Sequence, residues 1–110
     1  MKKFAYLTAA LALSAGMVVA QEKSAAKGDA EKGKAVFEQC GACHNTDTDE
    51  KKMGPSLMGL SKRAKLQNGK ANNEANLRAI LNNGGNGMPA YADLLTDEEK
   101  ADVLAYIRTL

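Results

Sequence analysis

Five consecutive residues hold both cysteines and the only histidine of the 110-residue chain: Cys40-Gly41-Ala42-Cys43-His44. Two thiols separated by two residues, with an imidazole directly after the second, form the pattern of covalent c-type haem attachment. The two sulfurs can form thioethers with vinyl-derived carbons on adjacent edges of the porphyrin, while the imidazole lies under the iron as its proximal ligand. The sequence therefore predicts one covalent haem, attached at Cys40 and Cys43 and ligated by His44.

Three other interpretations of the same residues stay open at this point. A Cys-x-x-Cys pair in an oxidising compartment can be a redox-active dithiol, although that chemistry usually accompanies βαβ structure and this sequence predicts no strands. A closed zinc site needs four ligands, and two cysteines with one histidine leave the fourth position without an obvious donor. The last alternative is a surface disulfide beside an incidental histidine.

A methionine is the natural candidate for the other side of the iron. Met53 and Met58 follow His44 by only 9 and 14 residues, in the segment that would wrap the proximal side, so we interpret them as core or loop packing. Met88 instead follows a predicted helix and the run Asn-Asn-Gly-Gly-Asn-Gly at residues 82–87, which can take almost any backbone path. The proline after it stiffens the chain. The sequence therefore predicts Met88 as the sixth ligand.

An imidazole that binds iron needs its second ring nitrogen held in place, usually by a backbone carbonyl. Gly54-Pro55 follows the motif in a turn-prone loop, and Pro55 offers a carbonyl oxygen without an amide hydrogen of its own. We therefore expect Pro55 to accept a hydrogen bond from His44. The alternative is that the Gly-Pro pair only forms a turn.

The N-terminal residues predict export. A basic start, an uncharged run of 17 residues from Phe4 to Ala20, and small residues at its end are typical of a Sec signal peptide. An uncleaved membrane anchor is the alternative, because 17 residues lie at the lower end of what can span a bilayer. We therefore divide the chain into a signal peptide at 1–20, a flexible lead-in at 21–28 and one domain at 29–110.

Large apolar residues are few for a domain of this size. Beyond residue 20 the chain has nineteen Phe, Tyr, Val, Ile, Leu and Met residues among 90, which is thin for a chain near the lower size limit of independent folding. One disulfide within Cys-x-x-Cys would close too small a loop to compensate. We therefore expect a bulky bound group to complete the core. The scarcity of β-branched residues also argues against a sheet.

Three segments combine a helix-capping residue with apolar positions at helical spacing. Asp29 can cap a helix that begins at Ala30 and runs into Cys40. Asn73 can cap a second helix, and Thr96 begins a capping box for a third. Between the first and second predicted helices, we expect a short helical turn at residues 56–60. The predicted fold class is therefore all-α, with three principal helices plus short helical turns.

The charge balance excludes some classes of partner. The whole chain has a net charge of +2, from 15 basic and 13 acidic residues, and the chain without residues 1–20 is formally neutral. Lysines and arginines are interleaved with acids, whereas a nucleic-acid-binding domain carries a concentrated basic surface. We therefore expect no nucleic-acid role, and only modest salt dependence of association unless charges cluster on one face.

Together these residues resemble a class I cytochrome c over residues 29–110. The matching segments are Gly33 to Phe37, Cys40 to His44, Gly54 to Leu60 and Gly87 to Tyr91. The chain looks more like the small bacterial cytochromes of the c6, c551 or c553 kind than the mitochondrial protein. The resemblance implies a cytochrome c fold wrapped around one covalent haem c per chain.

The resemblance also implies roles for single residues. It implies that the Met88 sulfur ligates the iron and that the Pro55 carbonyl accepts a hydrogen bond from His44. Arg63 falls where some members of the family place a cation near a haem propionate. The first and last helices are expected to cross at four residues: Gly33, Phe37, Val103 and Tyr106.

With His44 and Met88 both on the iron, no coordination position is left for a substrate, which favours one-electron transfer over catalysis. We therefore expect a soluble periplasmic electron carrier that is a monomer and not an enzyme. It would exchange electrons with transient membrane or periplasmic donor and acceptor proteins, without stable membrane insertion after cleavage. The competing hypothesis is a haem sensor or peroxidase-like enzyme, which would need a weak or absent Met88 bond; no second histidine supplies a distal acid–base group.

Overall fold

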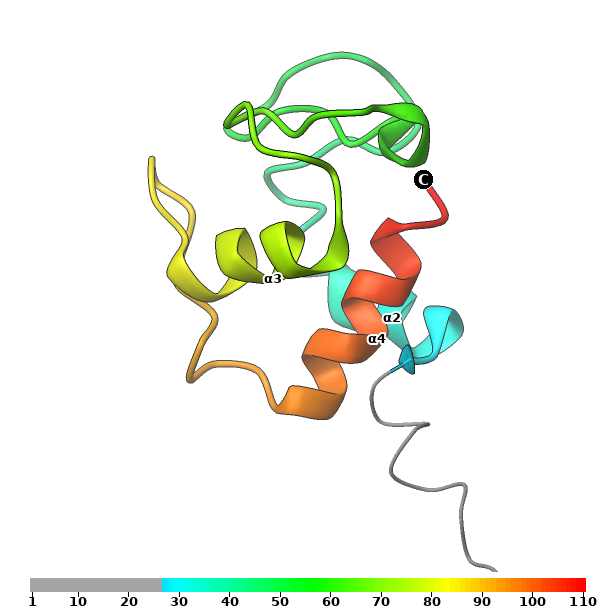
Figure 1. The fold of residues 1–110 in the computed structure, drawn as a ribbon, viewed down its shortest axis with the longest axis vertical. Helices are drawn as coiled ribbons and strands as arrows, with labels where there is room; N and C mark the ends of the chain where they lie inside the picture. Colours follow the sequence, from blue (N-terminus) through cyan, green and yellow to red (C-terminus); the bar gives the residue numbers. More distant parts are fainter. Residues whose placement is uncertain (1–26) are drawn as a thin grey trace, which may run out of the picture.

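The computed structural model describes residues 27–110. They form α2 (Ala30–Phe37), the 3₁₀ helix η1 (Leu60–Lys62), α3 (Glu74–Asn83) and α4 (Asp97–Ile107), as Figure 1 shows. The only β pairings within this part of the chain are two isolated bridges, which confirms the all-α prediction. None of these helices is long and apolar enough to cross a membrane. The predicted signal peptide, and the lead-in up to residue 26, lie outside the described residues.

Each α-helix begins after the capping residue that the sequence predicts. The Asp29 carboxylate accepts hydrogen bonds from two first-turn amides of α2, and the Asn73 side chain accepts one at the start of α3. At α4, the Thr96 amide donates to the Glu99 carboxylate at 3.0 Å, and the Glu99 amide donates to the Thr96 hydroxyl at 3.1 Å. These bonds satisfy amides that a helix leaves unpaired at its start.

The first helix is shorter than predicted. We expected it to run into Cys40, but α2 ends at Phe37. The amides of Cys40 and Gly41 both donate to the Phe37 carbonyl, at 2.7 and 3.0 Å. The last turn is therefore tightened, and the chain leaves the helix before it reaches the first cysteine.

The predicted helical turn at residues 56–60 is also displaced, because the 3₁₀ helix η1 begins only at Leu60. The hydroxyl of Ser56 explains the shift. It accepts a hydrogen bond from the Met58 amide at 3.2 Å and donates one to the Thr48 carbonyl. Side-chain bonds of this kind compete with the helical pattern of backbone bonds.

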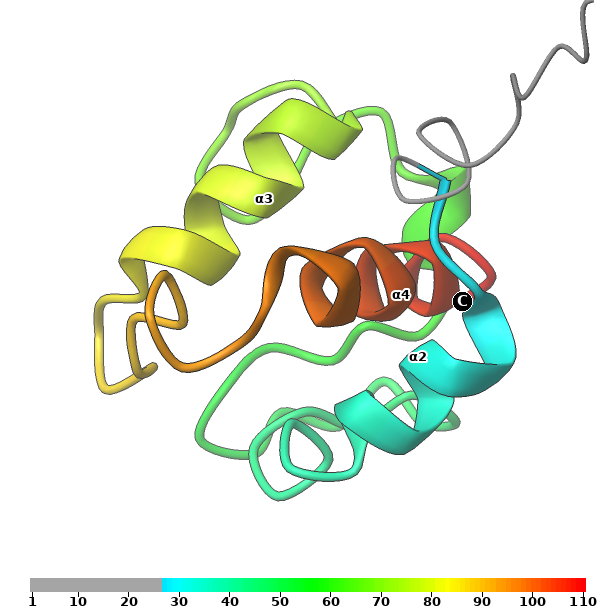
Figure 2. The same cartoon turned by 90° about the horizontal axis from the view of Figure 1, so that it is seen from below.

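Helices α2 and α4 pack against each other with Gly33 at the contact (Figure 2). A Cβ on Gly33 would overlap the carbonyl oxygen of Asp102 and lie 2.9 Å from the Cβ of Tyr106. The Phe37 and Tyr106 rings meet with centroids 5.2 Å apart, and the buried Asp102 carboxylate accepts the Asp29 amide hydrogen at 2.7 Å. The helix crossing implied by the resemblance is therefore present.

Replacing Gly33 by alanine is expected to destabilise the haem-loaded protein by about 2 kcal/mol or more, because the helices must separate to admit the methyl group. The measurement is the urea midpoint of unfolding. Gly41→Ala is the matched control, since a Cβ there would have its nearest neighbour at 3.4 Å and should change the midpoint little. A Gly33→Ala protein with the wild-type midpoint would show that the close crossing does not matter.

The buried core surrounds the first cysteine. Val103 and Leu104 of α4 are its most deeply buried side chains. Cys40, 8% exposed, belongs to the same cluster. The other buried members come from α2, α3, α4 and the segments between them: Phe37, Leu60, Leu66, Leu81, Tyr91, Leu95 and Ile107. The first attachment sulfur predicted from the sequence therefore lies inside the apolar core.

Candidate haem site

The residues of the Cys-x-x-Cys-His motif form a compact turn directly after α2. The amides of Cys43 and His44 both donate to the Cys40 carbonyl, at 3.1 and 3.0 Å. The two cysteines form no disulfide, and one is buried while the other is half-buried. Burial, with a smaller contribution from Cys43, raises the pKa of the Cys40 thiol. One short turn thus presents two thiols and an imidazole at the edge of the core.

The imidazole of His44 has one nitrogen held and one free. Its Nδ1 lies 2.8 Å from the carbonyl oxygen of Pro55, and since a carbonyl can only accept, Nδ1 carries the hydrogen and donates. Nε2 is then the unprotonated nitrogen, and it makes no hydrogen bond to residues 27–110. An imidazole in this form can bind a metal ion. The hydrogen bond expected from the sequence is present.

Gly54 lets the backbone lie directly against this imidazole. A Cβ at position 54 would overlap Cε1 of His44 and lie 2.7 Å from Nδ1 and 2.9 Å from Nε2. The Gly54 amide also donates to the Cys43 carbonyl at 2.8 Å. From the sequence we expected this glycine only as part of a turn; its contact with the imidazole depends on how the loop returns to the motif.

Gly54→Ala is expected to push the imidazole out of place. We expect fewer chains to carry haem and the folded protein to lose about 1–3 kcal/mol of stability, as overpacking does elsewhere. Intact mass gives the haem-loaded fraction, and the visible spectrum reports the iron environment. Wild-type values of both in Gly54→Ala, compared with Gly41→Ala as the control, would contradict the tight contact between residues 54 and 44.

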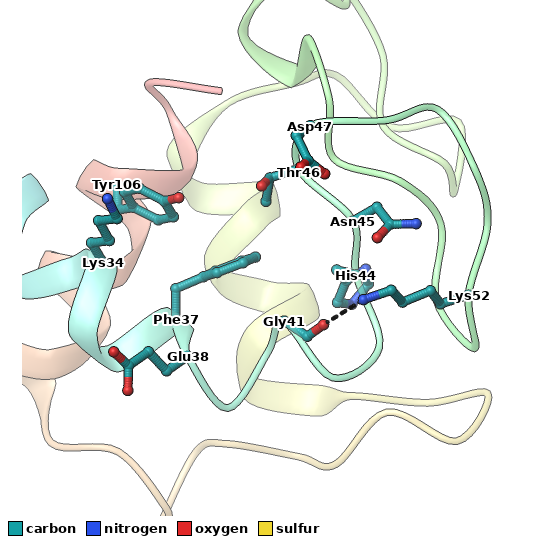
Figure 3. Close-up of a pocket in the computed structure, with 10 residues that line it drawn as sticks. All are labelled: Lys34, Phe37, Glu38, Gly41, His44, Asn45, Thr46, Asp47, Lys52 and Tyr106. Carbon is teal, nitrogen blue, oxygen red and sulfur yellow. Dashed lines mark hydrogen bonds between the residues drawn. The ribbon is translucent and has the colours of Figure 1, made fainter.

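The loop that follows His44 is fastened over the motif, as Figure 3 shows. The ammonium group of Lys52 donates to the Gly41 carbonyl at 3.0 Å. Beside this contact is a cavity of about 290 Å³ whose walls include the rings of Phe37, Tyr106 and His44. The aromatic rings of the helix crossing therefore reach the neighbourhood of the imidazole.

The loop between α3 and Met88 folds back on itself. Gly85 and Met88 exchange two backbone hydrogen bonds of 3.0 Å. All four residues from 84 to 87 have positive φ, and three are glycines, for which this conformation costs little. Met88 is half-buried and packs against the core, whereas Met53 and Met58 are 78% and 40% exposed. Of these three methionines, Met88 is the one that the core can offer as a ligand.

Tyr91 is buried beside the site, although the sequence identified it only as the last residue of the matching segment from Gly87 to Tyr91. It is 8% exposed and lies in the same cluster as Cys40. Burial first, and then the thiols of Cys40 and Cys43 before they carry haem, raise the pKa of its phenol. The ring therefore lies within electrostatic reach of both cysteines, and its hydroxyl stays protonated at neutral pH.

Arg63 is exposed and holds its own loop together. Its Nη2 donates to the carbonyl of Ser56 at 3.2 Å and to that of Met58 at 2.8 Å. Its other N–H groups make no hydrogen bond to residues 27–110. The expected contact with a haem propionate stays a prediction.

The donor groups fit a haem better than a bare metal ion. Within the described residues, no three His, Cys, Asp or Glu side chains lie close enough together to hold a metal ion, so this part of the chain offers no ligand set for the zinc alternative. Two thiols, an imidazole with one free nitrogen and a methionine sulfur from a separate loop are the groups that bind c-type haem.

Known proteins are similar to this chain over most of the described residues. The family model described as "Cytochrome C oxidase, cbb3-type, subunit III" matches residues 28–107. A cytochrome c-553-like protein of Synechocystis sp. is 32% identical over 87 residues, which cover 78% of this chain and 73% of that protein. The chain belongs to the class I cytochromes c. This cytochrome is also 30% identical over 96 residues to cytochrome c6 of the same organism, covering 84% of this chain and 74% of that protein.

A solved structure shows the same fold. Cytochrome c6 from the diatom Phaeodactylum tricornutum superposes with a TM-score of 0.60 and 28% sequence identity, covering 74% of this cytochrome and 93% of that chain. The predicted family and the cytochrome c fold are therefore confirmed. As a small monohaem member of the family, this cytochrome carries haem c covalently, and the zinc, dithiol and disulfide interpretations fall away.

Proposed function

We propose that this cytochrome is a one-electron carrier whose iron is bound by His44 and Met88 and whose haem is attached at Cys40 and Cys43. The haem supplies reversible one-electron exchange between Fe(III) and Fe(II). The observation that carries the proposal is the orientation of His44, whose Nδ1 is held by the Pro55 carbonyl at 2.8 Å while Nε2 is free.

Two protein ligands leave no coordination position for a substrate, and this favours electron transfer over catalysis. His44 is hydrogen-bonded to the Pro55 carbonyl and packs against the Gly54 backbone, so its ring needs little rearrangement to hold an iron. Met88 is offered by a loop whose two ends are hydrogen-bonded to each other. Rigid ligands of this kind keep the iron environment similar in both oxidation states.

The surroundings of the site favour the reduced state. A methionine ligand raises the potential of a haem, and so does burial among apolar side chains. Cys40, Tyr91 and Leu95 contribute such burial, each with 8% exposure or less. The Pro55 carbonyl opposes this in part, because a hydrogen bond to Nδ1–H makes the imidazole more basic. The free N–H groups of Arg63 are proposed to contact a haem propionate.

We further propose that residues 1–20 direct export and are removed, so that the working protein lies in the periplasm as a monomer. The basic start, uncharged run and small-residue ending of this segment support the proposal. Its partners would be membrane or periplasmic redox proteins that bind transiently through a small interface.

Expression of the full-length precursor with a c-type haem maturation system tests the function. We expect a periplasmic product shortened by residues 1–20, with the mass of one haem added. Its redox titration should follow a single one-electron curve, and its ferrous form should not bind carbon monoxide. Ready binding of carbon monoxide would favour a sensor or enzyme, and a colourless product would contradict the haem itself.

A further inference from the structure

The charged residues are segregated along the chain, so our expectation that they are interleaved is wrong. Between Glu50 and Glu74 the chain carries six cations and no acid, and between Arg78 and Lys100 it carries four acids and no cation. The two groups nearly cancel in a net charge of only +2. The total charge therefore conceals a strong asymmetry.

The cations of the loop around and after η1 lie at the opposite end of the molecule from the acids next to the start of α4, whereas Lys52 contacts the haem motif. In Figure 1 the green loop after η1 is at the top, and the orange segment leading into α4 is at the bottom. The basic loop consists of Lys62, Arg63, Lys65 and Lys70, and the acidic rim of Asp93, Asp97 and Glu98. All seven are exposed. Within residues 27–110 only one of them is in an ion pair, a contact of 3.9 Å between Asp97 and Lys100.

The acidic rim borders the place where the haem is attached. Tyr91 and Leu95 are buried in the same cluster as Cys40, so the segment 91–95 is anchored against the core at both ends. Asp93, between these anchors, is exposed. Tyr91 lies within electrostatic reach of Cys40 and Cys43, so the exposed Asp93 is only two residues from a side chain that neighbours the attachment site.

Exposed apolar side chains lie among these acids. Leu94 is 65% exposed, and Pro89 and Ala90, which follow the proposed ligand Met88, are exposed as well. An apolar centre with a charged rim is the usual composition of a protein docking surface. Asp97 and Glu98 lie in the first turn of α4, where a negative charge stabilises the helix through its dipole. This role does not explain Asp93 or Leu94, which lie before the helix.

We propose that the acidic rim, with Leu94 at its centre, is the surface at which this cytochrome exchanges electrons, and that it docks redox proteins presenting a cationic face. The proposal rests on the electron-carrier function proposed above. We expected modest salt dependence of association unless charges cluster on one face. The acidic rim is such a cluster, so its local charge, and not the net charge, is proposed to govern association.

Two small oxidants of opposite charge test the sign of the charge on this surface. The ferrous protein gives one electron either to tris(phenanthroline)cobalt(III), which becomes cobalt(II), or to hexacyanoferrate(III), which becomes hexacyanoferrate(II). Stopped-flow rates are measured over a range of ionic strength. We expect salt to slow the reaction with the cationic oxidant and to accelerate the reaction with the anionic one. The same salt dependence for both oxidants would overturn the proposal.

Charge-removing variants locate the surface. The variant with both Asp93→Asn and Glu98→Gln should transfer its electron to the cationic oxidant about threefold more slowly, or slower still, at low salt. Glu31→Gln with Asp49→Asn is the matched control, because it removes the same net charge from two exposed positions outside the rim. If the control variant slowed the reaction equally, the rate would depend on net charge and not on the acidic rim, and the proposal would be overturned. No oxidation of either protein by either complex would instead contradict electron transfer itself.

Discussion

Replacing Met88 by alanine is expected to lower the reduction potential by on the order of 0.1 V or more and to open the iron to external ligands. Axial ligands set haem potentials over roughly 0.8 V, and methionine raises them. The ferric variant should lose the weak red absorption band of methionine ligation, and its ferrous form should bind carbon monoxide. Redox titration and visible spectra of the two oxidation states provide the measurement.

Two other methionines serve as controls for this prediction. Met53 and Met58 are 78% and 40% exposed, so alanine at either position should leave the red band and the potential unchanged. If Met88→Ala kept the red band while Met58→Ala lost it, the iron ligand would be Met58 and not Met88. Loss of the band in none of the three variants would exclude methionine ligation by these residues altogether.

A chain with Cys40→Ala and Cys43→Ala is expected to lose its covalent haem and most of its stable fold. Because the chain offers few large apolar side chains, the free energy of haem binding is in large part the free energy of folding. We expect a loss on the order of 5 kcal/mol, which is comparable with the whole stability of a small domain. Intact mass checks the haem, and circular dichroism with urea checks the fold.

The single variants separate the two sulfurs. Cys40 is buried in the core and Cys43 is half-buried, so Cys43→Ala should keep one thioether and more of the stability than Cys40→Ala. A double variant that unfolds at the wild-type urea concentration would show that the polypeptide core is sufficient without the haem.

The parts of the fold that depend on neighbouring residues could be predicted from the sequence. Asp29, Asn73 and Thr96 cap α2, α3 and α4 as expected, because a capping side chain bonds to amides only two or three residues ahead. The pairing of His44 with Pro55 was expected because the motif needs a carbonyl and a Gly-Pro pair follows within a short loop.

The parts that depend on distant or competing contacts could not be predicted. The end of α2 at Phe37 depends on two amides that share one carbonyl, and the displacement of η1 depends on the hydroxyl of Ser56. The segregation of charge was missed because the total is close to neutral. Only the folded chain shows the basic loop and the acidic rim at opposite ends (Figure 1).

X-ray absorption at the iron edge tests most directly the claim that His44 and Met88 both ligate the iron. Thioether sulfurs at Cys40 and Cys43 bind the porphyrin edge and not the metal, so any sulfur found on the iron comes from a methionine. We predict five nitrogen neighbours and one sulfur in both oxidation states, with the sulfur absent in Met88→Ala. Six nitrogen or oxygen neighbours, or five in total without sulfur, would contradict the proposed electron carrier.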